Sequence, residues 1–173
     1  MKQWYMLTLV GEDRAGIVAA VTRELFNCGS NLGEAAMVRL GGNFSVMLMV
    51  EYGGDPELLQ QALSGVIERF SLNLHLMQIS GELHHHLEPN LQLTVYGADR
   101  TGIVAEVTAA LAENGFHILD MRTDVAGSSS EPIYVMQIEG FCSLGVAELL
   151  PRLKAAAAQQ VEIALREIDL MIG

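Results

Sequence analysis

The chain has 173 residues, of which 50% are hydrophobic and 18% charged, so it is not an intrinsically disordered protein. It contains 21 Asp and Glu against 10 Lys and Arg, a formal net charge of −11, which argues against binding nucleic acid or an anionic membrane surface. No run approaches the ~18 apolar residues of a membrane helix, and no signal-peptide cleavage site follows the first apolar segment, so we expect a cytoplasmic protein.

Two segments of the sequence repeat each other. Residues 7–22 read LTLVGEDRAGIVAAVT and residues 93–108 read LTVYGADRTGIVAEVT, so 11 of 16 positions are identical at an offset of 86. The likeness resumes where Val46-Met47 matches Val135-Met136 at an offset of 89. We therefore predict a tandem duplication, with a first domain over 1–81, a linker over 82–89 and a second domain over 90–173.

The first copy is predicted to contain four strands and two helices. Alternating apolar residues predict strands over 4–10, 32–40, 44–51 and 72–80, with a tight turn at 41–43. The first helix is expected to end near Cys28-Gly29. Its apolar stripe comprises Val18, Val21, Leu25 and Phe26.

The second helix of this copy should begin at Asp55-Pro56-Glu57, because proline is favoured at the first helical position. Its apolar stripe comprises Leu58, Leu59, Ala62, Leu63, Val66, Ile67 and Phe70.

The second copy is predicted to repeat this order. Strands are expected over 91–96, 117–125, 133–139 and 161–169, and helices over 101–114 and from about residue 144. Pro151 falls inside the last helix and should kink it. The order strand, helix, strand, strand, helix, strand predicts an α+β fold, in which two ferredoxin-like βαββαβ units each have an antiparallel sheet with both helices on one face.

The segments Gly11–Gly16 and Gly97–Gly102 are expected to connect a strand to a helix. A helix N-terminus offers free N–H groups to a carboxylate, and glycines let the backbone approach a ligand closely. Asp13 and Asp99 could accept from an ammonium group, so the loops suit a zwitterion. Alternatively, the two aspartates are helix N-caps and the glycines only form a sharp turn.

The motif G-x-D-R-x-G-I-V, present twice within βαββαβ units, resembles the ACT domain, a small amino-acid-sensing regulatory module. The resemblance covers about residues 4–80 and 90–170. A tandem pair with no attached catalytic domain is similar to the glycine cleavage system transcriptional regulators. That resemblance implies action on a partner transcription factor rather than on DNA, in agreement with the acidic composition.

The resemblance also implies that ligands sit at interfaces between neighbouring ACT units, against the loop and the start of the second strand. Carried over to this sequence, the ligand-binding residues are Gly11, Asp13, Arg14, Gly16, Ile17 and Asn31 in the first copy, and Gly97, Asp99, Arg100, Gly102 and Ile103 in the second. His117 replaces the asparagine in the second copy, which points to a degenerate second site. Many relatives carry proline where this chain has Ala15 and Thr101, so the loop loses some pre-organisation.

Other conspicuous residues have ordinary interpretations. Adjacent histidines at 84–86 point in different directions along an extended linker, so no metal site is expected. Cys28 and Cys142 read as small core residues without a disulfide. Met47 and Met49 read as core filling. Arg14 and Arg100 read as surface charges beside Glu12 or Glu106, or as ligand contacts.

The functional prediction is a non-enzymatic regulatory protein without a cofactor. It binds a small amino acid, glycine first by family analogy, where two ACT units pack side by side with their sheets joined edge to edge. Its other partner is a transcription factor of the glycine cleavage system, and association with further copies of the chain stays open. The alternatives are a docking module that needs no ligand and a regulatory subunit of an enzyme of amino-acid metabolism.

Overall fold

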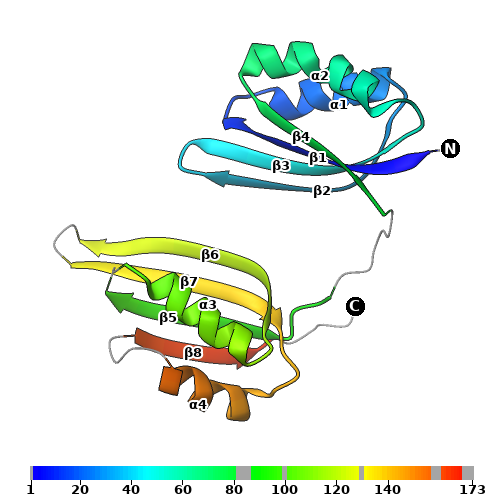
Figure 1. Cartoon of the computed structure of the whole chain (residues 1–173). Helices are drawn as coiled ribbons and strands as arrows, with labels where there is room; N and C mark the ends of the chain where they lie inside the picture. The colour runs from blue at the N-terminus through cyan, green and yellow to red at the C-terminus, as the bar shows by residue number, and fades with distance from the viewer. Residues whose placement is uncertain (1, 81–86, 99–100, 129–130, 157–160, 169–173) are drawn as a thin grey trace. The chain divides into compact units, whose positions relative to one another are not determined.

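A computed structural model describes residues 2–80, 87–98, 101–128, 131–156 and 161–168 of the chain. The chain divides into two compact units, Met1–His85 and His86–Gly173 (Figure 1). Within the described residues, no helix has the length and apolar character needed to cross a membrane.

The first unit is an antiparallel sheet of four strands with both helices on one face (Figure 1). The strand order is β2-β3-β1-β4. Its elements are β1 (Gln3–Glu12), α1 (Ile17–Asn27), β2 (Asn31–Leu40), β3 (Asn43–Tyr52), α2 (Pro56–Phe70) and β4 (Asn73–Ile79).

The second unit repeats this topology with strand order β6-β7-β5-β8. Its elements are β5 (Leu91–Ala98), α3 (Ile103–Glu113), β6 (His117–Ser128), β7 (Glu131–Phe141), α4 (Val146–Ala156) and β8 (Val161–Glu167). The prediction of two ferredoxin-like βαββαβ units is thereby confirmed.

Each unit buries its own core between the sheet and its two helices. In the first unit Leu7 and Leu9 of β1 are fully buried, and Leu93 and Val95 occupy the same places in β5. Because side chains alternate along a strand, the residues between them lie on the opposite face of each sheet, which we call the open face.

The inner face of α1 differs from the predicted stripe. Ile17, Val21 and Leu25 are buried, whereas Val18 is 44% exposed and Phe26 is 71% exposed. The buried and the exposed apolar residues both recur at helical spacing, so the sequence pattern did not show which of them face the core. In α2 the predicted stripe is mostly correct, since its buried residues are Leu59, Leu63, Val66 and Phe70, but Leu58 is 55% exposed.

The third strands of the two units correspond at an offset of 90 residues, so the predicted offset of 89 is wrong. Leu9 pairs with Val46 in β1–β3, and its counterpart Val95 pairs with Met136 in β5–β7. Val46 and Met136 are both buried. A shift of one residue exchanges the two faces of a strand. The correct alignment of β3 with β7 is therefore the one that places buried residues opposite each other, and not the one that matches identical residue types.

Two helix signals behave differently in the structure. The Asp55 carboxylate caps α2 by accepting a hydrogen bond from the N–H of Glu57 at 2.9 Å, as its position suggested. Helix α4 continues through Pro151, whose side chain is exposed beside the buried Leu149 and Leu153. Ala147, whose carbonyl would accept from residue 151, is also exposed, so water can satisfy that carbonyl.

Candidate functional site

The first glycine of each motif belongs to a strand and not to the loop, which corrects the predicted loop boundary. Gly11 pairs with Phe44 within β1–β3, and Gly97 pairs with Tyr134 within β5–β7. A Cβ at Gly11 would lie 2.7 Å from Cδ2 of Leu72. The absence of a side chain at Gly11 therefore lets Leu72 pack against the end of β1.

Asp13 anchors the first loop to the turn between β2 and β3. Its N–H donates to the carbonyl of Gly42 at 3.0 Å. Its carboxylate Oδ2 forms an ion pair with the guanidinium of Arg39 on β2. Asp13 is therefore not the N-cap of α1, which corrects that alternative. Arg14 forms an exposed ion pair with Glu12 at 2.6 Å, the surface arrangement that the sequence favoured.

Gly16 is the N-cap of α1 and adopts a left-handed conformation with φ 92°. Among the described residues no side chain caps this helix, and its first turn contains no acidic residue. The N–H of Ala20 donates to the carbonyl of Gly16 at 2.9 Å, so the N–H groups of the preceding first-turn residues have no acceptor within the helix. Ile17 points into the core. The helix N-terminus therefore offers donors and a partial positive charge to an anion.

The second loop has the same backbone but a different charge. Gly102 is the N-cap of α3 with φ 95°, and Ile103 is buried. The first turn of α3 carries Glu106, where α1 carries Ala20. A carboxylate at this place already interacts favourably with the helix dipole and opposes a second anion. The predicted site residues Asp99 and Arg100 lie outside the described residues.

Asn31 and His117 are the first residues of β2 and β6. Both side chains are exposed. Asn31 pairs with Glu51 of β3, whereas Glu12, beside the first loop, pairs with Asn43 of that strand. At roughly 3.4 Å per residue, these partners are about 27 Å apart along β3. A single unit therefore keeps its loop and its Asn31 at opposite ends of the sheet.

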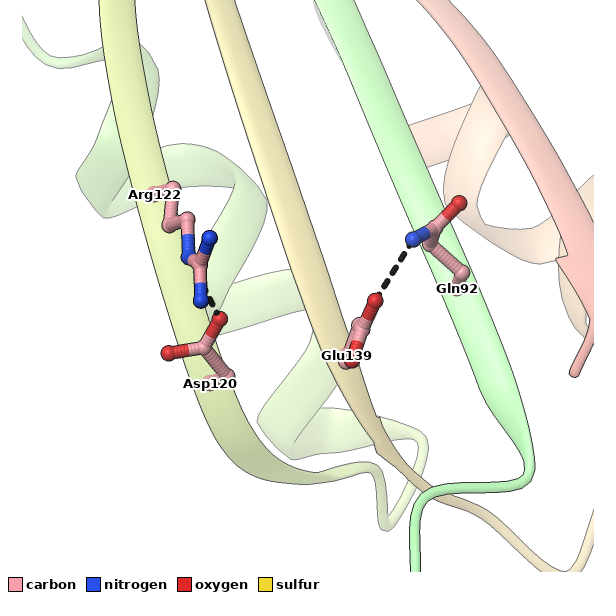
Figure 2. Close-up of polar contacts among 4 residues, drawn as sticks. All are labelled: Gln92, Asp120, Arg122 and Glu139. Carbon is pink, nitrogen blue, oxygen red and sulfur yellow. Dashed lines mark hydrogen bonds and ion pairs between the residues drawn. The ribbon is translucent and has the colours of Figure 1, made fainter.

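A second polar group lies on the open face of the second unit (Figure 2). The Gln92 amide donates to Oε1 of Glu139 at 2.6 Å, and Nε of Arg166 donates to Oε1 of Gln92 at 2.7 Å. On the neighbouring strand, Nε of Arg122 donates to Asp120 at 3.1 Å. Beside these residues is a depression of about 380 Å³, lined by Arg122, Thr123, Asp124, Val135 and Gln137.

The remaining predictions have mixed outcomes. Cys142 is buried and Cys28 is half-buried, both as free thiols, as expected. Met47 is 45% exposed on the open face of the first sheet, so its assignment to the core is wrong, whereas Met49 lies on the same face and is only 9% exposed. The histidines at 84–86 lie outside the described residues. Within the described ranges, no three His, Cys, Asp or Glu side chains converge as metal ligands.

Arg39 is the residue near the first loop that sequence reasoning missed. It lies 26 positions beyond Asp13 in the sequence, and only the pairing of β2 with β3 brings the two together. The corresponding position in the second unit is Val125, because Arg39 is opposite Phe44 and Val125 is opposite Tyr134. No motif spacing signals this contact.

Comparison with known proteins gives a match to the model of the ACT domain over residues 4–77 and 90–165. The protein YjhC of Lactococcus lactis, a UPF0237 protein, is 35% identical over 72 residues, which cover 41% of this chain and 83% of YjhC.

Two solved structures match nearly the whole chain. A protein of unknown function from Galdieria sulphuraria is 27% identical and superposes with a TM-score of 0.78 over 97% of this chain and 99% of that one. A protein proposed to be a glycine cleavage system transcriptional repressor is 19% identical, with a TM-score of 0.71 over 97% and 98% of the two chains. The second likeness concerns the fold alone.

Proposed function

Because the chain belongs to the family of ACT domains, which are regulatory domains, we propose that it is a cytoplasmic, non-enzymatic amino-acid sensor. In this proposal a small amino acid, glycine before others, binds where ACT units meet and changes the affinity of the chain for a transcription factor of the glycine cleavage system. Such control requires the ligand to bind two arrangements of the protein unequally.

The uncapped N-terminus of α1 is the observation that carries this proposal. Its free N–H groups suit the carboxylate of an amino acid, and no acidic side chain of its first turn opposes that charge. One oxygen of Asp13 is paired with Arg39, but a carboxylate has capacity to accept further hydrogen bonds from an ammonium group.

The site needs two ACT units. One unit holds its loop and the start of its second strand at opposite ends of the sheet, so a ligand that contacts both must contact the loop of one unit and the strand of another. Joining the sheets edge to edge would supply this arrangement and would protect the exposed edge strands. The ligand would then stabilise one arrangement of the units.

The choice of a protein partner rests on two supports. The net charge of −11 disfavours contact with DNA, so control of transcription has to pass through another protein. The connection with glycine cleavage rests on the likeness in fold to the proposed repressor and on the motif resemblance.

Calorimetric titration with glycine, serine and alanine tests the proposal, with thermal shifts as a second readout. We expect glycine to give saturable heat with the native chain and little or none with Asp13→Ala. Equal heat from both proteins would remove Asp13 from the site. No heat with any amino acid, together with unchanged capture of the transcription factor, would instead support the docking module.

An exchange of matched residues between the units provides the control. Ala20→Glu gives α1 the acidic first turn of α3, and Glu106→Ala does the reverse. If the helix N-terminus receives the carboxylate, Ala20→Glu weakens glycine binding several-fold, and Glu106→Ala leaves it unchanged or strengthens it. Circular dichroism of each variant verifies that the fold is retained. Glycine binding that is unchanged in Ala20→Glu would contradict the assigned role of α1.

A further inference from the structure

The open face of the first sheet is largely apolar, although Thr8, Asn43, Ser45, Asn73 and His75 also lie on it. At its centre Met6 of β1 lies between Met49 of β3 and Met77 of β4, and Met47 is next along β3. The strand register places further apolar residues on the same face, and we call the whole set the methionine face: Met6, Met47, Met49 and Met77 with Trp4, Val10, Val38, Leu40 and Ile79. Several members are more than 40% exposed, including Val38 and Leu40. A patch of this kind marks an interaction surface.

Charged residues of this face lie at its margin. Glu12 and Glu51 occupy opposite ends of the sheet, and they are paired with Arg14 and Lys2, at 2.6 and 2.9 Å. Glu34 lies near the irregular pairing at the start of β2, an edge strand, and it also has an interaction partner. The centre of the face can therefore be covered without burying an unpaired charge.

The chemistry of the covering surface follows from this distribution. A charged covering surface would find no side chain of opposite charge at the centre of the methionine face. The open face of the second unit is of that unsuitable kind, since the register places Asp120, Arg122, Asp124, Glu139, Glu162 and Arg166 on it. Covering these charges with methionine side chains would remove them from water at a cost that their mutual contacts, such as that of Arg122 with Asp120, repay only in part. A second methionine face has no such cost.

The area of the face is sufficient for a dimer. Strands β1, β2 and β3 have 10 residues each and β4 has 7. At about 4.8 Å between strands and 3.4 Å per residue, the sheet projects roughly 600 Å². Two copies would bury about 1,200 Å² before the uneven surface of the side chains is counted, which is at the lower limit of stable interfaces. Methionine is unbranched and flexible, so two identical faces can adjust to each other.

We propose that the methionine face is the surface through which two copies of this chain associate, face to face and related by a two-fold axis. Twisted sheets pack in this manner at a separation of about 10 Å, and a two-fold axis brings the same surface from both partners. The proposal does not depend on binding of an amino acid. The net charge of −11 repels the copies, so added salt should strengthen the association.

Sedimentation velocity on the full chain over a dilution series tests the proposal with a matched pair of variants. Met47 and Met37 belong to the same sheet and are 45% and 52% exposed, but Met37 pairs with the buried Val46 and so lies on the helix-covered face. We expect a native dimer, and Met47→Glu should raise its dissociation constant at least about 100-fold. Met37→Glu should leave the constant within a few-fold.

A native protein that remains monomeric at high concentration would overturn the proposal. Equal effects of Met47→Glu and Met37→Glu on the dissociation constant would overturn it as well. Circular dichroism identifies a variant that has lost its fold, and in that event Met47→Gln, the residue type found at position 137, replaces Met47→Glu in the comparison.

Peroxide footprinting on the native chain distinguishes the occupants of the face, because hydrogen peroxide oxidises accessible methionines to the sulfoxide. For a dimer, Met47 and Met77 should be oxidised slowly at high protein concentration and quickly after dilution, while Met37 reacts at one rate throughout. Slow oxidation at every concentration would mean that the chain covers its own face, and fast oxidation at every concentration would mean that the face is free. Either result contradicts the proposal.

Discussion

The open faces of the two sheets differ in chemistry at structurally identical positions. In the first unit Met6 lies between Met49 and Met77, and in the second unit Gln92 lies between Glu139 and Arg166. Three apolar side chains at neighbouring register positions have become an amide, a carboxylate and a guanidinium joined by hydrogen bonds of 2.6 and 2.7 Å.

The helix-covered faces of the same strands have changed little. Leu7 and Leu48 correspond to Leu93 and Ile138, and all four are buried. A core accepts only apolar residues of suitable volume, whereas the open face is constrained only by whatever contacts it. The comparison teaches that the duplication kept one folding unit and gave its two copies different surfaces, and that functional differences between the units belong to those surfaces.

The largest effect should come from the cores, where the units are alike. Leu7→Ala and Leu93→Ala each empty a fully buried site and should each lower the free energy of unfolding by about 3 kcal/mol. Urea denaturation measures the loss, and hydrogen exchange locates it in the unit that carries the substitution. A loss of protection spread evenly over both units would show that they unfold as one, and the comparison of separate cores would fail.

The two loop glycines should give the next largest effect. Gly16 and Gly102 have φ of 92° and 95°, and a Cβ at Gly16 would meet nothing within 4 Å, so alanine costs only the backbone strain. We expect each substitution to lower the free energy of unfolding by about 1 to 2 kcal/mol in thermal or urea unfolding. Gly65→Ala, in the exposed middle of α2, is the control and should stabilise the protein slightly. Opposite signs at Gly16 and Gly102 would show that the two loops are not equivalent.

The contrast between the open faces can be measured with two double-mutant cycles. In the second unit, Gln92→Met and Glu139→Met should show a coupling free energy of about 1 kcal/mol, because the pair shares a charge-assisted hydrogen bond. In the first unit, Met6→Gln and Met49→Glu introduce the same side chains at the same register. Urea unfolding of the single and double variants provides the coupling free energy of each pair. A coupling free energy near zero in the second unit would show that its polar pair does not stabilise the open face.

The smallest effect is expected at the ion pair of the first loop. The side chains of Asp13 and Arg39 are 28% and 67% exposed, and such pairs contribute little because water and salt screen them. A cycle with Asp13→Asn and Arg39→Met should give a coupling of about 0.3 to 0.5 kcal/mol that declines as salt is added. A coupling that resists salt would show that this pair anchors the loop, a difference from the second unit, where Val125 replaces the arginine.

The sequence predicted the fold because its signals were local and present twice. Alternating strands, proline after Asp55 and glycine after each first helix each specify an element by itself, and all of these elements are found. It misjudged which apolar residues of α1 face the core, since Val18 and Phe26 fit a helical period as well as Ile17 and Val21. It also misaligned the third strands. The identical pairs Val46-Met47 and Val135-Met136 match at an offset of 89, one residue away from the structural offset of 90.

The candidate site was predictable only in part. The motif itself located the left-handed glycines at 16 and 102, whose backbone needs a residue without Cβ. The partner of Asp13 depends on the pairing of β2 with β3, which the sequence near Asp13 does not encode. The distance between Asn31 and the loop likewise follows from strand direction and not from position along the chain.

The sequence by itself determined the duplicated βαββαβ order and the apolar content of each core, because hydrophobic periodicity is written along the chain. The tertiary structure determined which methionines lie on the open face of the first sheet and which carboxylate pairs with which guanidinium. It also determined which ends of the sheet hold the loop and Asn31. Side chains alternate from one face of a strand to the other, so these neighbours depend on the register between strands distant in sequence.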